Sequence, residues 1–105
     1  MGQVIWTETA LSDLRGIVEY IAKDSPIYAE RFGTRLVRAP RLLEKTPLLG
    51  RMVPEYNDAS IREIIFGAYR VIYKATEHAC LILAIIHGSR DIIRHLEPGA
   101  WDIEP

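Results

Sequence analysis

The sequence lacks three features, each of which would define a class of protein. It has one cysteine, Cys80, so no disulfide can form within the chain, and a lone thiol in an apolar run is typically a small buried side chain. No apolar run reaches the roughly 18 residues that a membrane-spanning helix requires. The first residues carry no basic segment ahead of an apolar one, so we expect no secretory signal. These absences predict a cytoplasmic protein with no membrane span.

The chain also lacks an excess of basic charge. Its 105 residues include 13 Lys or Arg and 14 Asp or Glu, which gives a formal net charge of −1. Domains that bind nucleic acids in general are usually basic, so any contact with a nucleic acid would have to be local. The three histidines show none of the spacings of a zinc site, and no glycine-rich phosphate loop is present. We therefore expect no metal and no cofactor.

The first part of the chain predicts a strand and a helix. At this length we expect a single domain over residues 1–105, with 96–105 as a loose tail. Residues 3–6 have the composition of a short strand, and Thr7 follows as a candidate helix N-cap. Apolar residues at spacings of three and four then predict an amphipathic helix over 7–22 with one buried face: Leu11, Leu14, Ile17, Val18 and Ile21.

A second helix is predicted over 26–45. Ser25 supplies an N-cap and Pro26 a first residue that has no N–H to leave unpaired, so the two helices should form a tight hairpin. Pro40 lies inside the second helix and should kink or shorten it. A basic stripe runs along its outer side, and such a stripe is either a solvated face or a surface for an acidic partner segment. The stripe consists of Arg31, Arg35, Arg38, Arg41 and Lys45.

The second half of the chain predicts an antiparallel β-meander. Three β-rich runs, 61–66, 69–74 and 80–86, are separated by turn signals at 66–68 and 76–78. The run 80–86 is apolar on both faces and should be the most buried strand, with helices covering it on at least one face. The predicted fold is therefore α+β, with an N-terminal strand and helix hairpin packed on a C-terminal antiparallel β-meander.

Three arginines lie in or just beyond successive predicted strands. Arg62, Arg70 and Arg90 could be gathered by the fold on one side of the domain. The alternative for Arg70 is a structural ion pair across the sheet with Glu63 or Asp91. Both interpretations stay open.

Two histidines could move a proton near neutral pH, namely His87 and His95. His87 closes an apolar strand, where a histidine is more often a hydrogen-bonded structural residue.

Several motifs, taken in order and spacing, resemble those of the ParE/RelE superfamily of bacterial toxins from type II toxin–antitoxin systems. The resemblance covers residues 3 to 96 and includes an opening Trp6-Thr7 before a helix. The motifs are Pro47-x-x-Gly50-Arg51, Pro54-Glu55, Arg62-Glu63, Gly67-x-Tyr69-Arg70-x-x-Tyr73 and His87-x-x-Arg90. The resemblance implies a RelE-like toxin fold and a toxin that is held inactive by a cognate antitoxin, a small protein with an amphipathic segment.

The resemblance also implies one of two mechanisms. The RelE-like branch cuts messenger RNA in the ribosomal A site, whereas the ParE-like branch poisons DNA gyrase. Ile64 stands where RelE-like members carry a second basic residue, and their C-terminal acid/base tyrosine has no match here. These departures favour a ParE-like toxin that inhibits gyrase by binding, with no catalytic residue.

The alternative is a metal-independent, ribosome-dependent mRNA endoribonuclease. Its candidate residues would be Arg62, Arg70, His87, Arg90 and His95. A third interpretation is a family member that has lost its toxicity.

Overall fold

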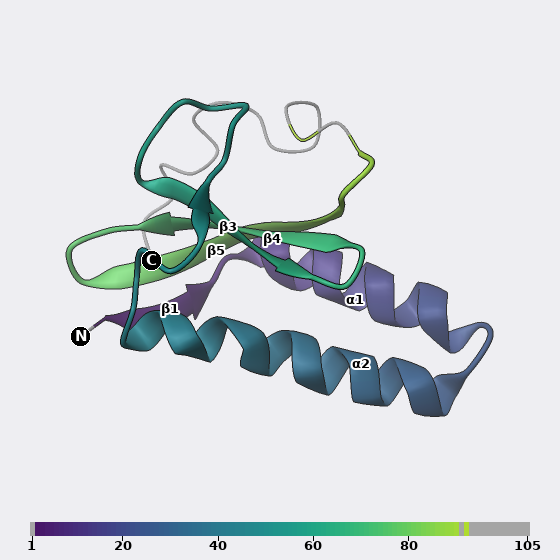
Figure 1. The fold of residues 1–105 in the computed structure, drawn as a ribbon. Coiled ribbons are helices and arrows are strands. Elements are labelled where there is room, and N and C mark those ends of the chain that lie inside the picture. Colours follow the sequence, from purple (N-terminus) through teal and green to yellow (C-terminus); the bar gives the residue numbers. More distant parts are fainter. Residues whose placement is uncertain (1, 91, 93–105) are drawn as a thin grey trace.

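The computed structural model describes residues 2–90 and 92, and shows a five-stranded sheet with two helices across one face (Figure 1). The strand order is β1-β5-β4-β3-β2. This arrangement confirms the predicted α+β fold with a helix hairpin on a β-meander. The elements are β1 (Gln3–Trp6), α1 (Glu8–Ala22), α2 (Pro26–Arg38), the 3₁₀-helix η1 (Ala39–Glu44), β2 (Arg51–Met52), β3 (Ile61–Phe66), β4 (Tyr69–Ala75) and β5 (Ala79–His87).

The sheet is mixed, because the N-terminal strand joins the predicted antiparallel meander in the parallel direction. Strands β3, β4 and β5 form the expected meander, but β1 lies beside β5 and runs parallel to it, with Gln3 opposite Ala79 and Trp6 opposite Ile82. Neighbouring parallel strands need a long crossover connection, which the helices and the other strands supply here. Periodicity does not show which strand an N-terminal strand will pair with, so the direction of β1 could not be predicted.

Two side-chain caps begin the helices, as predicted. The Thr7 hydroxyl oxygen accepts a hydrogen bond from Ala10 N–H at 3.2 Å, and the hydroxyl donates to the carbonyl of Ile82 in β5 at 2.7 Å. Thr7 therefore both begins α1 and attaches it to the sheet. The Ser25 hydroxyl oxygen accepts from Tyr28 N–H at 3.2 Å and begins α2.

The second helix is shorter than predicted. α2 ends at Arg38 instead of Lys45, and the chain continues as the 3₁₀-helix η1. Pro40 explains the change, because proline has no N–H to donate to the α-helical ladder and its ring crowds the preceding turn. η1 still buries Leu43 in the core.

Apolar side chains cover both faces of the sheet. On the helix face, Val71, Tyr73 and Ile82 pack with side chains of α1 and α2. On the other face, Ile72 and Leu83 pack beneath the connection between β2 and β3. The predicted burial of β5 is confirmed, since eight of its nine residues are buried.

A β-bulge in β5 changes which of its side chains face the helices. β5 carries one extra residue opposite β4, Leu83. Before the bulge Ile82 joins the helix-side core, and after it Ile85 does so. Strict alternation would have placed Ile86 there. The bulge therefore turns the last part of β5, including His87, toward α1.

The apolar face of α1 is less buried than predicted. Of its 15 residues, all of them described, only Ala10 is fully buried. Leu11 is 38% exposed, and Leu14, Ile17 and Val18 are partly exposed. α1 therefore carries more apolar surface than the fold uses.

The buried side chain of Tyr73 organises the loop that leads into β2. Its hydroxyl donates to the Pro47 carbonyl at 2.7 Å and accepts from Gly50 N–H at 2.9 Å. Burial raises the pKa of the Tyr73 hydroxyl, so it remains a donor. Gly50 lies against the carbonyl of Glu63 too closely to admit any side chain. A glycine is therefore required at this position.

We expect Tyr73→Phe to lower the free energy of unfolding by about 1–3 kcal/mol, because the buried Gly50 N–H loses its acceptor. Urea unfolding followed by circular dichroism measures the change. Tyr20→Phe is the matched control, because Tyr20 is 69% exposed, and it should change the free energy by less than about 0.5 kcal/mol. Equal losses in the two variants would contradict the assignment.

Candidate functional site

Arg70 is bound by two carboxylates. Its Nε donates to Glu63 Oε1 at 2.5 Å, and its Nη1 and Nη2 donate to the two oxygens of Glu55, both at 2.9 Å. The Glu55 carboxylate, and then Glu63, raise the pKa of the Arg70 guanidinium, and Arg70 in turn lowers the pKa of the Glu55 carboxyl. The structural interpretation of Arg70 is therefore confirmed for Glu63, whereas Asp91 lies outside the described residues.

Glu63 joins β2, β3 and β4 through one buried carboxylate. Its side chain is fully buried, and its second oxygen accepts a hydrogen bond from Arg51 Nε at 2.5 Å. A buried carboxylate needs such partners, since an unpaired charge in the interior costs several kcal/mol. Both guanidinium groups on Glu63, from Arg51 and Arg70, are therefore part of the fold.

Arg62 lies on the opposite face of the sheet from Arg70. It pairs in register with Tyr73, so it shares the helix face, whereas Arg70 points to the side of Glu63. The Arg62 Nε and Nη1 donate to the carbonyls of Ala59 at 2.9 Å and Gly50 at 3.0 Å. The expected gathering of three guanidinium groups on one side is therefore wrong, because the register of β3 and β4 separates two of them.

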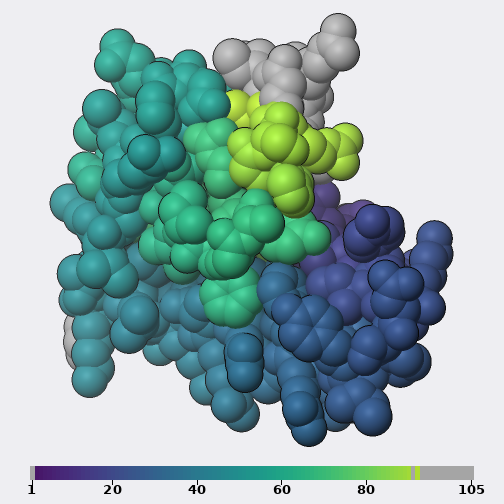
Figure 2. All heavy atoms as spheres, turned by 45° about the vertical axis from the view of Figure 1, so that its right-hand side comes forward, coloured from purple at the N-terminus to yellow at the C-terminus, as the bar shows by residue number. Residues whose placement is uncertain are grey.

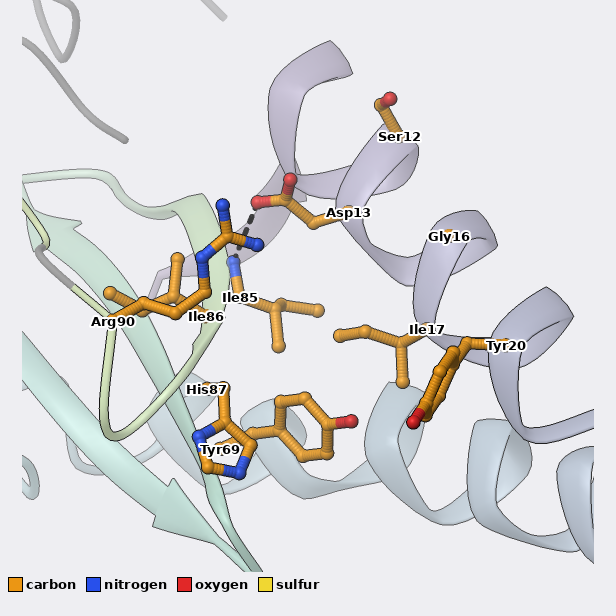
Figure 3. Close-up of a pocket in the computed structure, with 10 residues that line it drawn as sticks. All are labelled: Ser12, Asp13, Gly16, Ile17, Tyr20, Tyr69, Ile85, Ile86, His87 and Arg90. Atoms are coloured by element: carbon orange, nitrogen blue, oxygen red, sulfur yellow. Dashed lines mark hydrogen bonds between the residues drawn. The ribbon is translucent and has the colours of Figure 1, made fainter. Parts of the chain in front are cut away.

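A cavity of about 520 Å³ opens between α1 and the end of β5 (Figure 3). Ile17 and Ile85 point toward each other across its floor, and Arg90 reaches in from the opposite side to Tyr20 (Figure 3). The cavity brings together two of the predicted site residues, His87 and Arg90. The full lining is Ser12, Asp13, Gly16, Ile17, Tyr20, Tyr69, Ile85, Ile86, His87 and Arg90.

Several contacts hold the walls of this cavity. Asp13 Oδ2 accepts the N–H of Ile85 at 2.9 Å, beyond the point where β1 stops pairing with β5. His87 Nδ1 accepts the N–H of Ser89 at 3.2 Å, and its ring lies edge-on to Tyr69 at 5.6 Å between centroids. Arg62 and Arg70 are not among the described residues that line the cavity. The site therefore contains one imidazole and one guanidinium, and it lacks the other two predicted cations.

A second hollow, the helix groove, has a volume of about 430 Å³ and runs between α1 and α2. Its floor is apolar, and the helices meet closely at Gly33, where an added Cβ would lie 3.1 Å from Val18 Cγ2. Arg38 and Arg41 of the basic stripe stand at its edge. The groove is lined by Leu14, Val18, Ala29, Glu30, Gly33, Thr34, Val37, Arg38 and Arg41.

Sequence reasoning missed some of the residues that build these hollows. Asp13, Gly16 and Tyr20 had no predicted role in a site. A glycine inside an otherwise regular helical pattern is an available signal, because it usually has a packing or functional reason. His95 lies outside the described residues, so its placement stays a prediction. Among the described helices, none is both long and apolar enough to cross a membrane.

The fold and its two hollows define a small α+β protein with a helix hairpin on a sheet and apolar surfaces left open on either side of α1. The family model for the ParE toxin of the type II toxin–antitoxin system parDE matches residues 4–92. The chain therefore belongs to the ParE toxin family and is the toxin component of a type II toxin–antitoxin system, as the sequence motifs predicted. Membership implies a cognate antitoxin as partner.

Two further similarities agree with this family. The chain is 35% identical over 91 residues to Toxin RelE2 of Caulobacter vibrioides, which covers 86% of this chain and 99% of that protein. Its structure is similar to a chain of the chromosomal ParDE toxin–antitoxin system from P. aeruginosa, with a TM-score of 0.70 and 20% identity, over 83% of this chain and 96% of that one. At that identity the second similarity shows the fold alone.

We expect Glu63→Gln to lower the free energy of unfolding by about 3–5 kcal/mol, because it leaves the largely buried guanidinium of Arg70 with an incomplete partner. Arg51→Ala is the control on the same carboxylate. Its side chain is 64% exposed, so the loss should be about 1 kcal/mol or less. Urea unfolding measures both variants, and a larger loss for Arg51→Ala would show that Glu63 depends mainly on that partner.

Proposed function

We propose that this toxin acts by binding DNA gyrase and that it has no catalytic residue of its own. The observation that supports the proposal is the use of two of the three candidate arginines by the fold. Arg70 donates to two carboxylates, and Arg62 donates to two carbonyls on the opposite face. Of the three candidate arginines, Arg90 lines the cavity at the end of β5, whereas Arg62 and Arg70 are not among its described lining residues.

Cleavage of a phosphodiester demands more than this cavity offers. The reaction develops extra charge on the phosphoryl oxygens, which a ribonuclease without a metal must stabilise with several aligned donors. It also needs a group that moves the proton of the 2′-hydroxyl, and losing such a group typically costs about 10²- to 10⁴-fold in rate. His87 and Arg90 supply one group of each kind. A single pair of this kind would make a poor nuclease.

A binding mechanism agrees with the exposed apolar surface. Large apolar side chains exposed together on a small protein commonly mark sites of protein interaction. They are concentrated on α1, on α2 and η1, and in the segment leading to β2. Among the described residues, those more than a third exposed are Leu11, Tyr20, Ile27, Tyr28, Val37, Leu42, Leu48, Leu49, Met52 and Ile65.

The alternative, a ribosome-dependent endoribonuclease, is favoured by the meeting of His87 and Arg90 in one cavity. The 35% identity to a protein named Toxin RelE2 also supports it. Both candidate targets are found in the cytoplasm, so we propose that the toxin acts there under either mechanism.

The antitoxin, we infer, lays an amphipathic helix in the helix groove. The apolar floor offers anchors such as Val18 and Val37, and the adjacent Arg38 and Arg41 favour an acidic segment. This is the second interpretation of the basic stripe, in which its cations orient a partner.

We expect the double substitution Arg38→Glu and Arg41→Glu to weaken the complex with the antitoxin at least about tenfold, with a steeper loss at low salt, because both changes place repulsive charge beside the groove. Isothermal titration calorimetry against the protein encoded next to the toxin measures the affinity. Arg15→Glu, on α1 and outside the groove lining, is the charge control and should bind within about twofold of the wild type. Equal weakening by the control would place the antitoxin elsewhere.

The gyrase proposal is tested by assaying one preparation of toxin on both candidate targets. We expect the purified protein to inhibit supercoiling by gyrase while leaving message in translating ribosomes intact, and His87→Ala and His95→Ala to inhibit gyrase as the wild type does. A wild type that cuts message, together with a folded histidine variant that does not, would replace the proposal with the endoribonuclease. His78→Ala, in the β4–β5 turn, controls for loss of a histidine.

A further inference from the structure

The cavity at the end of β5 and the helix groove lie on different sides of α1. The cavity takes Gly16, Ile17 and Tyr20 from this helix, whereas the groove takes Leu14 and Val18. With 3.6 residues per turn, the mean directions of these two sets differ by roughly 130° around the helix. A partner helix seated in the groove therefore leaves the cavity available to a second partner.

Gly16 lines the cavity and has no side chain to fill it. In the part of the chain that the structure describes, and apart from its chain neighbours and the backbone of α1 itself, no atom lies within 4 Å of the position that a Cβ would take at Gly16. Close packing therefore does not require glycine there, in contrast to Gly33, where an added Cβ would contact Val18. Glycine within a helix weakens it relative to alanine, so position 16 sacrifices helix stability and leaves open space.

The lining of the cavity combines an apolar floor, aromatic walls, the guanidinium of Arg90 and the carboxylate of Asp13. Ile17 and Ile85 form the floor, and the rings of Tyr20 and Tyr69 stand at one end (Figure 3). Arg90 extends over the other end. Such a site fits an aromatic or large aliphatic side chain, with a neighbouring carboxylate that pairs with the guanidinium.

The surface around the cavity continues as a series of aromatic contacts. Tyr69 packs against Phe32 at 5.7 Å, and Phe32 against Tyr28 at 6.1 Å, toward the tip of the helix hairpin. There Ile27 is 67% exposed and Tyr28 is 54% exposed. In the space-filling view, the yellow-green end of the described chain lies beside the green β3–β4 hairpin, above the blue helices (Figure 2). This extent of surface suits a protein segment more than a small metabolite.

We propose that the cavity is the anchor site through which the toxin holds its protein target. An exposed loop of the target inserts an aromatic or large aliphatic side chain between Ile17 and Ile85, and a carboxylate beside that side chain pairs with Arg90. The proposal rests on the proposed function in one respect, namely that the toxin acts by binding a protein. It does not require the target to be gyrase.

The chemistry of the cavity is tested with N-acetyl-L-tryptophan, which carries an aromatic ring and a carboxylate. The methyl signals of Ile17 and Ile85 are followed by NMR during titration to millimolar concentrations. We expect saturable shifts in the wild type and in Gly16→Ala, and at least about tenfold weaker binding to Gly16→Trp, whose side chain fills the cavity. Arg90→Glu should also weaken binding, since it reverses the charge without filling the space. Absence of saturable shifts in the wild type, or equal binding to Gly16→Trp, overturns the proposal.

Growth arrest on expression then tests the role of the cavity in the cell. We expect Gly16→Trp to abolish the arrest while it still binds the antitoxin, and Gly16→Ala to retain both properties. Full arrest by a folded Gly16→Trp variant overturns the anchor site whatever the target is. Arrest by the wild type without inhibition of gyrase refutes the gyrase proposal alone, and the anchor site stands if Gly16→Trp relieves that arrest. A wild type that causes no arrest overturns both proposals.

Discussion

The buried carboxylate of Glu63 is the interaction on which the sheet and the interpretation of the site both depend. Its two oxygens accept hydrogen bonds from Arg51 on β2 and Arg70 on β4, and Glu55 accepts one hydrogen bond from each of Nη1 and Nη2 of Arg70. A charge buried in this way destabilises the fold unless every partner is in place. On the face of the sheet away from the helices, Arg70 is therefore held by ion pairs within the protein, and a substrate phosphate would have to displace a carboxylate to reach it.

The apolar surface that remains exposed beside the two hollows lies on the helix side of the molecule. α1 buries one residue fully and shows apolar side chains on either side, toward the helix groove and toward the cavity at the end of β5. If the toxin acts by binding a protein, as proposed, the two hollows beside α1 provide separate surfaces for the antitoxin and for the target.

Local signals in the sequence predicted the helices and strands well. The features that they did not predict depend on how strands pair across the sheet. The hydroxyl caps at Thr7 and Ser25 and the meander follow from residues close together in the chain. The bulge at Leu83 and the direction of β1 depend on which strands pair and in which register, and the periodicity of apolar residues does not predict either. That Arg62 and Arg70 lie on opposite faces could have been predicted from the sequence. The two-residue turn at Gly67, whose φ is +58°, sets the register of β3 and β4, and this register places the two arginines on opposite faces of the sheet.

The central claim is that the fold itself uses Arg70, so that the sheet presents no cationic cluster to RNA. Hydrogen exchange of the arginine Nε–H groups, observed directly by ¹⁵N NMR on the free toxin, tests it most simply. Arg70 should show slow exchange, because its Nε–H is donated to a fully buried carboxylate, whereas Arg90 should exchange rapidly at the edge of its cavity. Exchange at Arg70 as rapid as at Arg90 would mean that its guanidinium is available to a substrate, and would contradict this account.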